Sequence, residues 1–227
     1  MSTVPIVPED VQGDDKWMSM HRRFLQDARD AEPEVLWIGD SLIQNLCLSK
    51  IWEKSFCAMH SLNFGIGGDR TEHVLWRLEN GELENISPKI VVVLVGTNNH
   101  GDTPEQIAEG LKVICTVIRD RQPQSFVLLL SLLPRGHQPN SLRDRNKAVN
   151  GIMEEYVKGN SKLQFVNIDT GFIQADKSIS HHDMYDYLHL TQKGYSMAFE
   201  PVNELLIQLL QEMEGEVERP ETEGCAD

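Results

Sequence analysis

The chain has 227 residues, of which 40% are hydrophobic and 25% charged, a composition typical of one globular domain. Its formal net charge of −14 divides into −6 for residues 212–227, −4 for residues 1–15 and −4 for residues 16–211. We therefore expect a single domain of residues 16–211 between an acidic N-terminal segment and an acidic, disordered C-terminal tail, and the lack of a basic stripe argues against nucleic acid as a partner.

The cysteines and the apolar segments indicate the compartment. Cys47, Cys57, Cys115 and Cys225 have no CxxC or framework spacing, which predicts free thiols in a reducing compartment. Residues 1–12 lack the features of a signal peptide, and no apolar run approaches the 18 residues of a membrane-spanning helix. The sequence therefore predicts a cytoplasmic protein.

Strand and helix patterns alternate along the chain. Apolar runs predict strands at residues 35–38, 61–64, 90–95, 126–132 and 163–168. Helices are predicted at residues 17–30, 42–56, 71–80, 103–121, from Asn140 or Ser141 to residue 157, and 191–213. The alternation predicts an α/β fold in three layers, with a five-stranded parallel sheet in the flavodoxin-like order 2-1-3-4-5.

A dinucleotide-binding site is the first alternative for such a sheet. Gly65, Gly67 and Gly68 superficially resemble the glycine loop of that fold. Their spacing does not match G-x-G-x-x-G, however, and they follow the second strand rather than the first. We therefore expect another kind of site.

Polar or glycine residues follow each of the first three predicted strands. Ser41 follows the first strand, Gly68 the second and Asn98 the third. Because the carboxyl ends of parallel strands share one edge of the sheet, these residues are expected to meet there. A serine hydroxyl beside the Ser41 amide, the Gly68 amide and the Asn98 carboxamide has the composition of a nucleophile with an oxyanion hole.

A base and its partner are expected in the irregular stretch 169–190, after the fifth strand. Asp186 and His189 are three residues apart there, close enough for one turn to direct both toward the same cleft. The carboxylate can then hold the imidazole while the other ring nitrogen faces Ser41. The sequence thus predicts a catalytic Ser41, His189 and Asp186.

Each of these residues also has an ordinary structural interpretation. Ser41 could cap a helix, Gly68 could serve a turn, and Asn98 could cap a loop. Taken singly these alternatives stay open, but their joint occurrence after successive strands favours the catalytic interpretation.

A metal site is a further alternative, near the predicted base. His181, His182 and Asp183 are ligand types that zinc prefers. They do not form a paired ligand motif on an evident helix, so we expect neither a metal nor another cofactor.

Short blocks of the chain resemble those of the SGNH (GDSL-type) hydrolase superfamily: Gly39-Asp40-Ser41, Gly67-Gly68-Asp69, Gly96-Thr97-Asn98-Asn99 and Asp186-Tyr187-Leu188-His189. More narrowly, longer stretches resemble the catalytic alpha subunits of the intracellular (type I) platelet-activating-factor acetylhydrolases: residues 62–69, 73–84, 132–136 and 180–190. This likeness extends over residues 10–210.

The resemblance implies the same nucleophile, base, partner and oxyanion hole, and an acyl pocket lined by Leu42, Thr97 and Leu188. It implies a serine esterase of the 1-alkyl-2-acetylglycerophosphocholine esterase type, which removes the sn-2 acetyl group of platelet-activating factor without a metal. Homodimers or heterodimers of alpha subunits are implied, as is a WD-repeat propeller partner, the dynein-regulating lissencephaly protein. The alternatives are an SGNH esterase acting on other acyl esters and a binding scaffold for the propeller protein, although an intact Ser41, Asp186 and His189 argue against a catalytically inactive scaffold.

Overall fold

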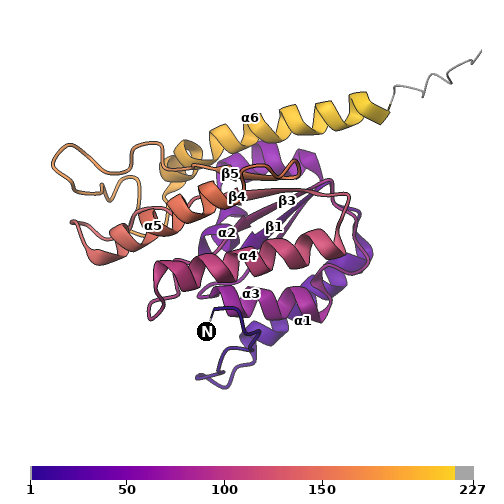
Figure 1. Cartoon of the computed structure of the whole chain (residues 1–227), viewed down its shortest axis with the longest axis horizontal. Coiled ribbons are helices and arrows are strands. Elements are labelled where there is room, and N and C mark those ends of the chain that lie inside the picture. The colour runs from indigo at the N-terminus through magenta and orange to yellow at the C-terminus, as the bar shows by residue number, and fades with distance from the viewer. Residues whose placement is uncertain (1, 218–227) are drawn as a thin grey trace, which may run out of the picture.

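The computed structural model describes residues 2–217, and its centre is a parallel sheet in the order β2-β1-β3-β4-β5 (Figure 1). The strands are β1 (Val35–Gly39), β2 (Ser61–Gly65), β3 (Ile90–Leu94), β4 (Phe126–Leu130) and β5 (Leu163–Val166). The predicted fold class and strand order are confirmed. The last three predicted strands are one or two residues longer than the observed ones.

The strand β1 lies between β2 and β3, at the point where the strand order reverses. Gly39 at its carboxyl end is in register with Gly65 of β2 and Leu94 of β3. Every residue of β1 and β3 is buried, as their apolar sequences predicted. The loops that follow these three strands therefore leave the sheet side by side.

Helices cover both faces of the sheet. One face carries α1 (Lys16–Asp30), α3 (Thr71–Arg77), α4 (Pro104–Arg121) and α5 (Ser141–Tyr156) (Figure 1). The rings of Phe24 in α1 and Phe64 in β2 stack on this face, with centroids 4.6 Å apart.

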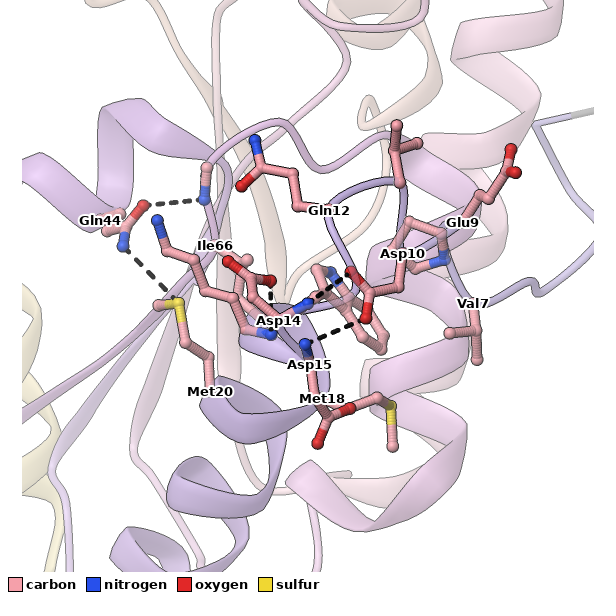
Figure 2. Close-up of a pocket in the computed structure, with 15 residues that line it drawn as sticks. Val7, Glu9, Asp10, Gln12, Asp14, Asp15, Met18, Met20, Gln44 and Ile66 are labelled. Atoms are coloured by element: carbon pink, nitrogen blue, oxygen red, sulfur yellow. Dashed lines mark hydrogen bonds between the residues drawn. The ribbon is translucent and has the colours of Figure 1, made fainter.

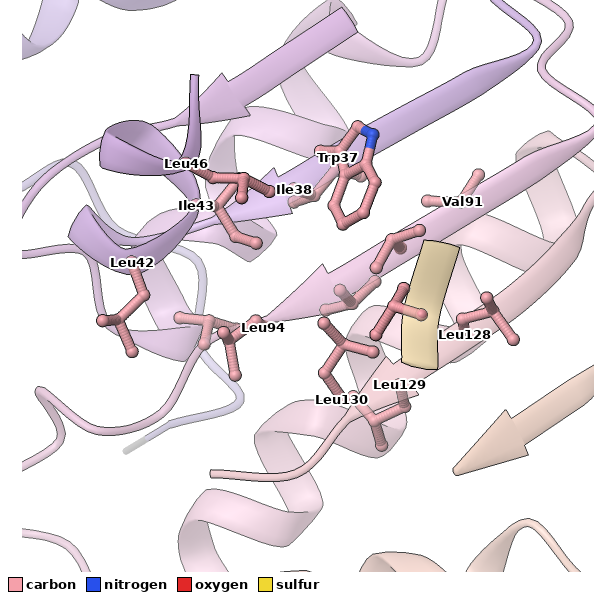
Figure 3. Close-up of a cluster of buried hydrophobic side chains, with 14 of the residues drawn as sticks. Trp37, Ile38, Leu42, Ile43, Leu46, Val91, Leu94, Leu128, Leu129 and Leu130 are labelled. Atoms are coloured by element: carbon pink, nitrogen blue, oxygen red, sulfur yellow. The ribbon is translucent and has the colours of Figure 1, made fainter. Parts of the chain in front are cut away.

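The other face carries the π-helical turn η1 (Trp52–Phe56), the 3₁₀ turn η2 (Cys57–Met59) and α6 (Gln192–Val217). Trp37 of β1 packs against two of these elements, with its ring centroid 4.6 Å from that of Phe56 in η1 and 6.0 Å from that of Phe199 in α6. Figure 3 shows Trp37 in the same buried cluster as Ile43 and Leu46 of α2 (Ser41–Leu46). The sheet thus lies between two layers of helices. The short helix α2 directly follows β1 at the carboxyl edge of the sheet.

The prediction of one continuous helix over residues 42–56 is wrong. α2 ends at Leu46, and a turn separates it from the segment that leads into η1. The Ser49 hydroxyl donates to the Leu46 carbonyl (2.6 Å) and accepts from the Trp52 amide (3.2 Å). The serine side chain therefore closes one helix and caps the next.

Other helix ends follow the capping signals in the sequence. Thr103 and Gln106 form a reciprocal capping box before α4, and the Asn140 side chain accepts the Leu142 and Arg143 amides before α5. Asn140 rather than Ser141 is thus the cap of α5.

Helix α3 passes into a π turn, η3 (Leu78–Glu82), which contains Gly81 at φ 106°.

The last helix is longer than predicted. Helix α6 extends to Val217, beyond its predicted end at residue 213, while the rest of the predicted tail, residues 218–227, lies outside the described residues. Cys47, Cys57 and Cys115 are free thiols, and Cys225 also lies outside the described residues. Of the helices in residues 2–217, none combines the length and hydropathy that crossing a bilayer requires.

Candidate active site

Ser41 is the first residue of α2, directly after the turn that follows β1. A Cβ at Gly39 would lie 2.2 Å from the Leu94 carbonyl oxygen and 2.6 Å from Ile43 Cγ1, so only glycine fits this turn. The Asp40 carboxylate accepts the Leu42 amide (2.9 Å) and caps the helix. The chain thus presents the serine hydroxyl at the carboxyl edge of the sheet.

Asp40 itself is fully buried, directly before Ser41 in the chain. This burial raises the pKa of Asp40 to about 7, against the smaller opposing effect of its bond to the Leu42 amide. Near neutral pH the carboxyl therefore adds less negative charge next to Ser41 than an ordinary aspartate would.

The predicted Ser41, His189 and Asp186 are brought together in one hydrogen-bonded series. Ser41 Oγ lies 2.9 Å from His189 Nε2, and His189 Nδ1 lies 2.6 Å from Asp186 Oδ2. The other carboxylate oxygen, Asp186 Oδ1, accepts the amides of Leu188 (3.1 Å) and His189 (2.7 Å). Partial burial opposes the charge of Asp186, but the bonds from His189 and Leu188 hold its pKa below the usual value.

The loop that carries the imidazole has an unusual backbone conformation. Tyr187 adopts a left-handed conformation (φ 63°), and its carbonyl accepts the Gly136 amide (2.7 Å). The Tyr185 amide donates to the His189 carbonyl (3.0 Å), which closes the loop on itself. Strained residues of this kind are found at functional sites. Tyr187 could not be predicted to be one, because non-glycine residues rarely adopt this conformation.

The loop after β2 lies next to Ser41, and the loop after β3 is bonded to it. A Cβ built on Gly67 would lie 3.7 Å from Ser41 Cβ, and the neighbouring Gly68 is exposed, with φ 83°. Asn98 Nδ2 donates to the Asp69 carbonyl (3.0 Å), so the two loops are bonded to each other. A carboxamide nitrogen carries two hydrogens, and this bond uses one of them.

Gln44 fixes the position of the loop after β2. Its Oε1 accepts the Gly67 amide (2.8 Å), and its Nε2 points to Met20 Sδ of α1 (3.7 Å) (Figure 2). Gln44 lies three residues after Ser41 in α2, so one helix holds both the predicted nucleophile and the adjacent glycine loop.

Two arginines hold the loop after β3 and were missed in the sequence. Arg135 donates to the Thr97 carbonyl (2.9 Å) and hydroxyl (3.1 Å), while Arg145 donates to the carbonyls of Thr97 (3.0 Å) and Asn99 (2.8 Å). These bonds satisfy carbonyl groups that the strand no longer pairs. Arg135 and Arg145 lie 38 and 48 residues after Thr97 in the chain, so their bonds to it could not be predicted from the sequence.

A buried ionic cluster beneath the glycine loop was also missed. Arg77 of α3 has no exposed surface and contacts the carboxylates of Asp69 (2.9 Å) and Glu82. Burial opposes its charge, but Glu82 and Asp69 raise the pKa of Arg77 above its usual value. Arg77 also donates to the carbonyls of Gly39 (3.3 Å) and Phe64 (3.1 Å), so it ties the ends of β1 and β2 to the loop that carries Gly68.

The three residues predicted for the acyl pocket lie next to the site in the chain. Leu42 and Thr97 are buried and Leu188 is half-buried. Leu42 extends from α2 on the side facing Leu94 (Figure 3), and its carbonyl accepts the Tyr195 hydroxyl (2.8 Å). Their lining of a pocket stays a prediction.

The residues of the alternative metal site have partners of their own. Asp183 accepts a hydrogen bond from Lys193 (2.7 Å), and the rings of His181 and His182 face each other, with centroids 4.0 Å apart. Within residues 2–217 no group of three or more histidine, cysteine, aspartate or glutamate side chains is placed to hold a metal ion.

A hydroxyl, an imidazole and a carboxylate in hydrogen-bonded series, beside loops with amide donors, form the arrangement that serine hydrolases use. The sequence profile of the GDSL-like lipase/acylhydrolase family matches residues 37–197, and the chain belongs to this family of carboxylic ester hydrolases.

Relatives are similar over nearly the whole chain. Platelet-activating factor acetylhydrolase IB subunit alpha1 of Bos taurus is 53% identical over 212 residues, which are 93% of this chain and 91% of the relative. The alpha2 subunit of Rattus norvegicus is 51% identical over 211 residues, with 93% and 92% covered.

Solved structures with lower identity share the fold. A GDSL-like lipase from Bacteroides thetaiotaomicron superposes with a TM-score of 0.70 at 20% identity, covering 85% of this chain and 98% of that one. A carbohydrate acetylesterase from Sinorhizobium meliloti gives 0.62 at 15% identity, with 78% and 100% covered.

Proposed function

We propose that this chain is a serine esterase that removes the sn-2 acetyl group of platelet-activating factor and related short-chain acetyl phospholipids. The observation that carries the proposal is the series Ser41 Oγ–His189–Asp186, with contacts of 2.9 and 2.6 Å. The identity of 51–53% to acetylhydrolase subunits named for this substrate supports the choice of ester.

The first half of the reaction transfers the acetyl group to the enzyme. Ser41 Oγ attacks the acetyl carbonyl carbon while His189 Nε2 takes the hydroxyl proton. The carbonyl oxygen gains negative charge, which the amides of Ser41 and Gly68 and the Asn98 carboxamide stabilise. The bond to the leaving alcohol then breaks, and His189 returns its proton to that oxygen.

The second half releases acetate. A water molecule gives a proton to His189 Nε2 and attacks the acetyl carbon of the acyl-enzyme. The bond to Ser41 Oγ breaks, and the serine recovers its proton from the imidazole. Throughout both halves the Asp186 carboxylate accepts a hydrogen bond from His189 Nδ1–H and stabilises the protonated ring. Two backbone amides donate to the same carboxylate and keep it in place.

Selectivity for acetyl is proposed to come from Leu42, Thr97 and Leu188. Each is joined by one peptide bond to a proposed catalytic residue, and the proposal is that its side chain lies close to the reacting carbonyl. Two leucines leave room for a methyl group and little more. A methylene that fits poorly in such a pocket changes discrimination about 10–200-fold.

A panel of esters tests substrate and pocket together. We expect kcat/KM to fall steeply from acetyl to propionyl to butyryl esters of one glycerophospholipid, Leu188→Ala to flatten that fall, and Ser41→Ala to abolish turnover. Equal rates for acetyl and butyryl esters would leave a general acyl esterase instead, and no turnover of any ester by the wild type would favour the scaffold alternative.

We also propose that the chain is cytoplasmic and assembles as a homodimer or with a second alpha subunit. A further proposed partner is a WD-repeat propeller protein, the dynein-regulating lissencephaly protein. The names of the relatives as subunits support assembly. Light scattering at micromolar concentration is expected to give twice the 25.8 kDa of one chain. A mass of one chain would contradict the homodimer, and failure to co-elute with the purified propeller protein would contradict that partner.

A further inference from the structure

A cleft of about 350 Å³ lies beside the candidate active site (Figure 2). One wall is the N-terminal segment of residues 7–15, another is the start of α1, and the third is formed by Gln44, Ile66 and Gly67. Its volume is within the range of sites that bind small molecules. None of the proposed catalytic steps uses this cleft.

The cleft begins where the proposed oxyanion loop ends. Gly67 lines it, and a Cβ on Gly67 would lie 3.7 Å from Ser41 Cβ. Gln44 also lines it, one helical turn after Ser41. A group that leaves the acetyl carbon on the side of this loop would therefore enter the cleft directly.

The lining is mainly apolar: Val7, Pro8, Val11, Trp17, Met18, Met20 and Ile66. Val7 and Val11 are 43% and 84% exposed, although apolar side chains are usually covered. Methionines adapt their shape to flexible apolar ligands. An apolar chain lying in the cleft would remove this surface from water.

The charges of the cleft disfavour an anionic occupant. Glu9, Asp10, Asp14 and Asp15 line it, against Lys16 as the single cation among the lining residues and Arg22, which pairs with Asp15 from outside the lining. The Asp10 carboxylate is turned toward its own loop, where it accepts the amides of Gly13 (2.9 Å), Asp14 (3.3 Å) and Asp15 (3.0 Å) (Figure 2). A phosphate or a fatty carboxylate would be repelled, whereas an uncharged hydrocarbon chain would not.

We propose that this cleft is the subsite for the hydrocarbon chain of the alcohol that leaves Ser41. The substrate class is thus an acetyl ester whose leaving group carries a long alkyl chain, and the identity of that ester rests on the function proposed above. Figure 2 shows Val7 and Met18 on the opposite side of the cleft from Gln44, so they contact the far part of the chain.

Inhibition by linear 1-alkanols tests this subsite without the phospholipid. With p-nitrophenyl acetate as the reporter substrate, the inhibition constants for wild type are expected to fall about fourfold for each methylene from hexanol to decanol. The double variant Val7→Asp/Met18→Asp is expected to lose this dependence for the longer alcohols. Ile207→Asp on α6 is the matched control, because Ile207 is 42% exposed and lies outside the cleft.

Inhibition constants that do not depend on chain length, or the same dependence in the double variant and the control, would overturn the proposal. Circular dichroism of the double variant checks that it folds, and tritium-labelled decanol in equilibrium dialysis gives a second measure of binding. Wild type that binds alkanols in this way but does not hydrolyse acetyl phospholipids would overturn the proposed function alone and leave the subsite in place.

Discussion

Replacing Asp186 with asparagine is expected to lower kcat about 10⁴-fold while KM changes little. In the structure Asp186 Oδ1 accepts the amides of Leu188 and His189, and Oδ2 faces His189 Nδ1. An asparagine would keep its oxygen on the two amides and turn its NH₂ group toward Nδ1. The ring would then carry its proton on Nε2, which could no longer accept the proton of Ser41.

Steady-state kinetics with a soluble acetyl ester between pH 6 and 9 measures this loss. Asp183→Asn is the matched control, since Asp183 is in the same loop but bonds Lys193. The control is expected to retain kcat within about threefold, the size of an effect without loss of a transition-state contact. A loss below tenfold for Asp186→Asn would show that the carboxylate does not set the ring tautomer.

The second large effect is on stability. Arg77→Met is expected to lower the free energy of unfolding by about 3–5 kcal/mol, because it leaves two carboxylates buried without their cation. Asp69 is 1% exposed and Glu82 has no exposed surface, so water cannot replace the guanidinium. The Gly39 and Phe64 carbonyls would also lose a donor at the edge of the sheet that carries Ser41.

Urea denaturation at pH 7 measures this change, and Arg121→Met is the control. Arg121 lies 3.9 Å from Glu84 at the surface, where such a pair contributes at most about 1 kcal/mol. Equal losses for the two variants would mean that the cluster around Arg77 is not the source of the effect.

The sheet and the meeting of the loops could be predicted because they depend on patterns that a sequence displays. Runs such as residues 90–95 have few structures open to them other than a buried strand. Once the strands are placed in order, topology alone brings the loops with Ser41, Gly68 and Asn98 to one edge. The contacts that join Ser41 to His189 and His189 to Asp186 show that the loop after the fifth strand reaches Ser41 as well.

Features that depend on single side-chain bonds could not be predicted. The break after α2 arises from one hydroxyl, on Ser49, which looks like any polar residue in a helical pattern. Arg77 is a charged residue in a helix, and charge normally indicates an exposed face, whereas here its partners Asp69 and Glu82 are buried with it. The bond from Gly67 to Gln44 joins a loop to helix α2, and only the folded structure fixes the distance between them.

The central claim, that Ser41 is a nucleophile activated by His189, has a direct measurement. An organophosphate fluoride is added in slight excess, and the intact mass and the modified peptide are determined by mass spectrometry. The claim predicts one phosphoryl group per chain, on Ser41, with hydrolysis lost in proportion to labelling and no label on Ser41→Ala. A label on another residue, or full activity after Ser41 is labelled, would contradict it.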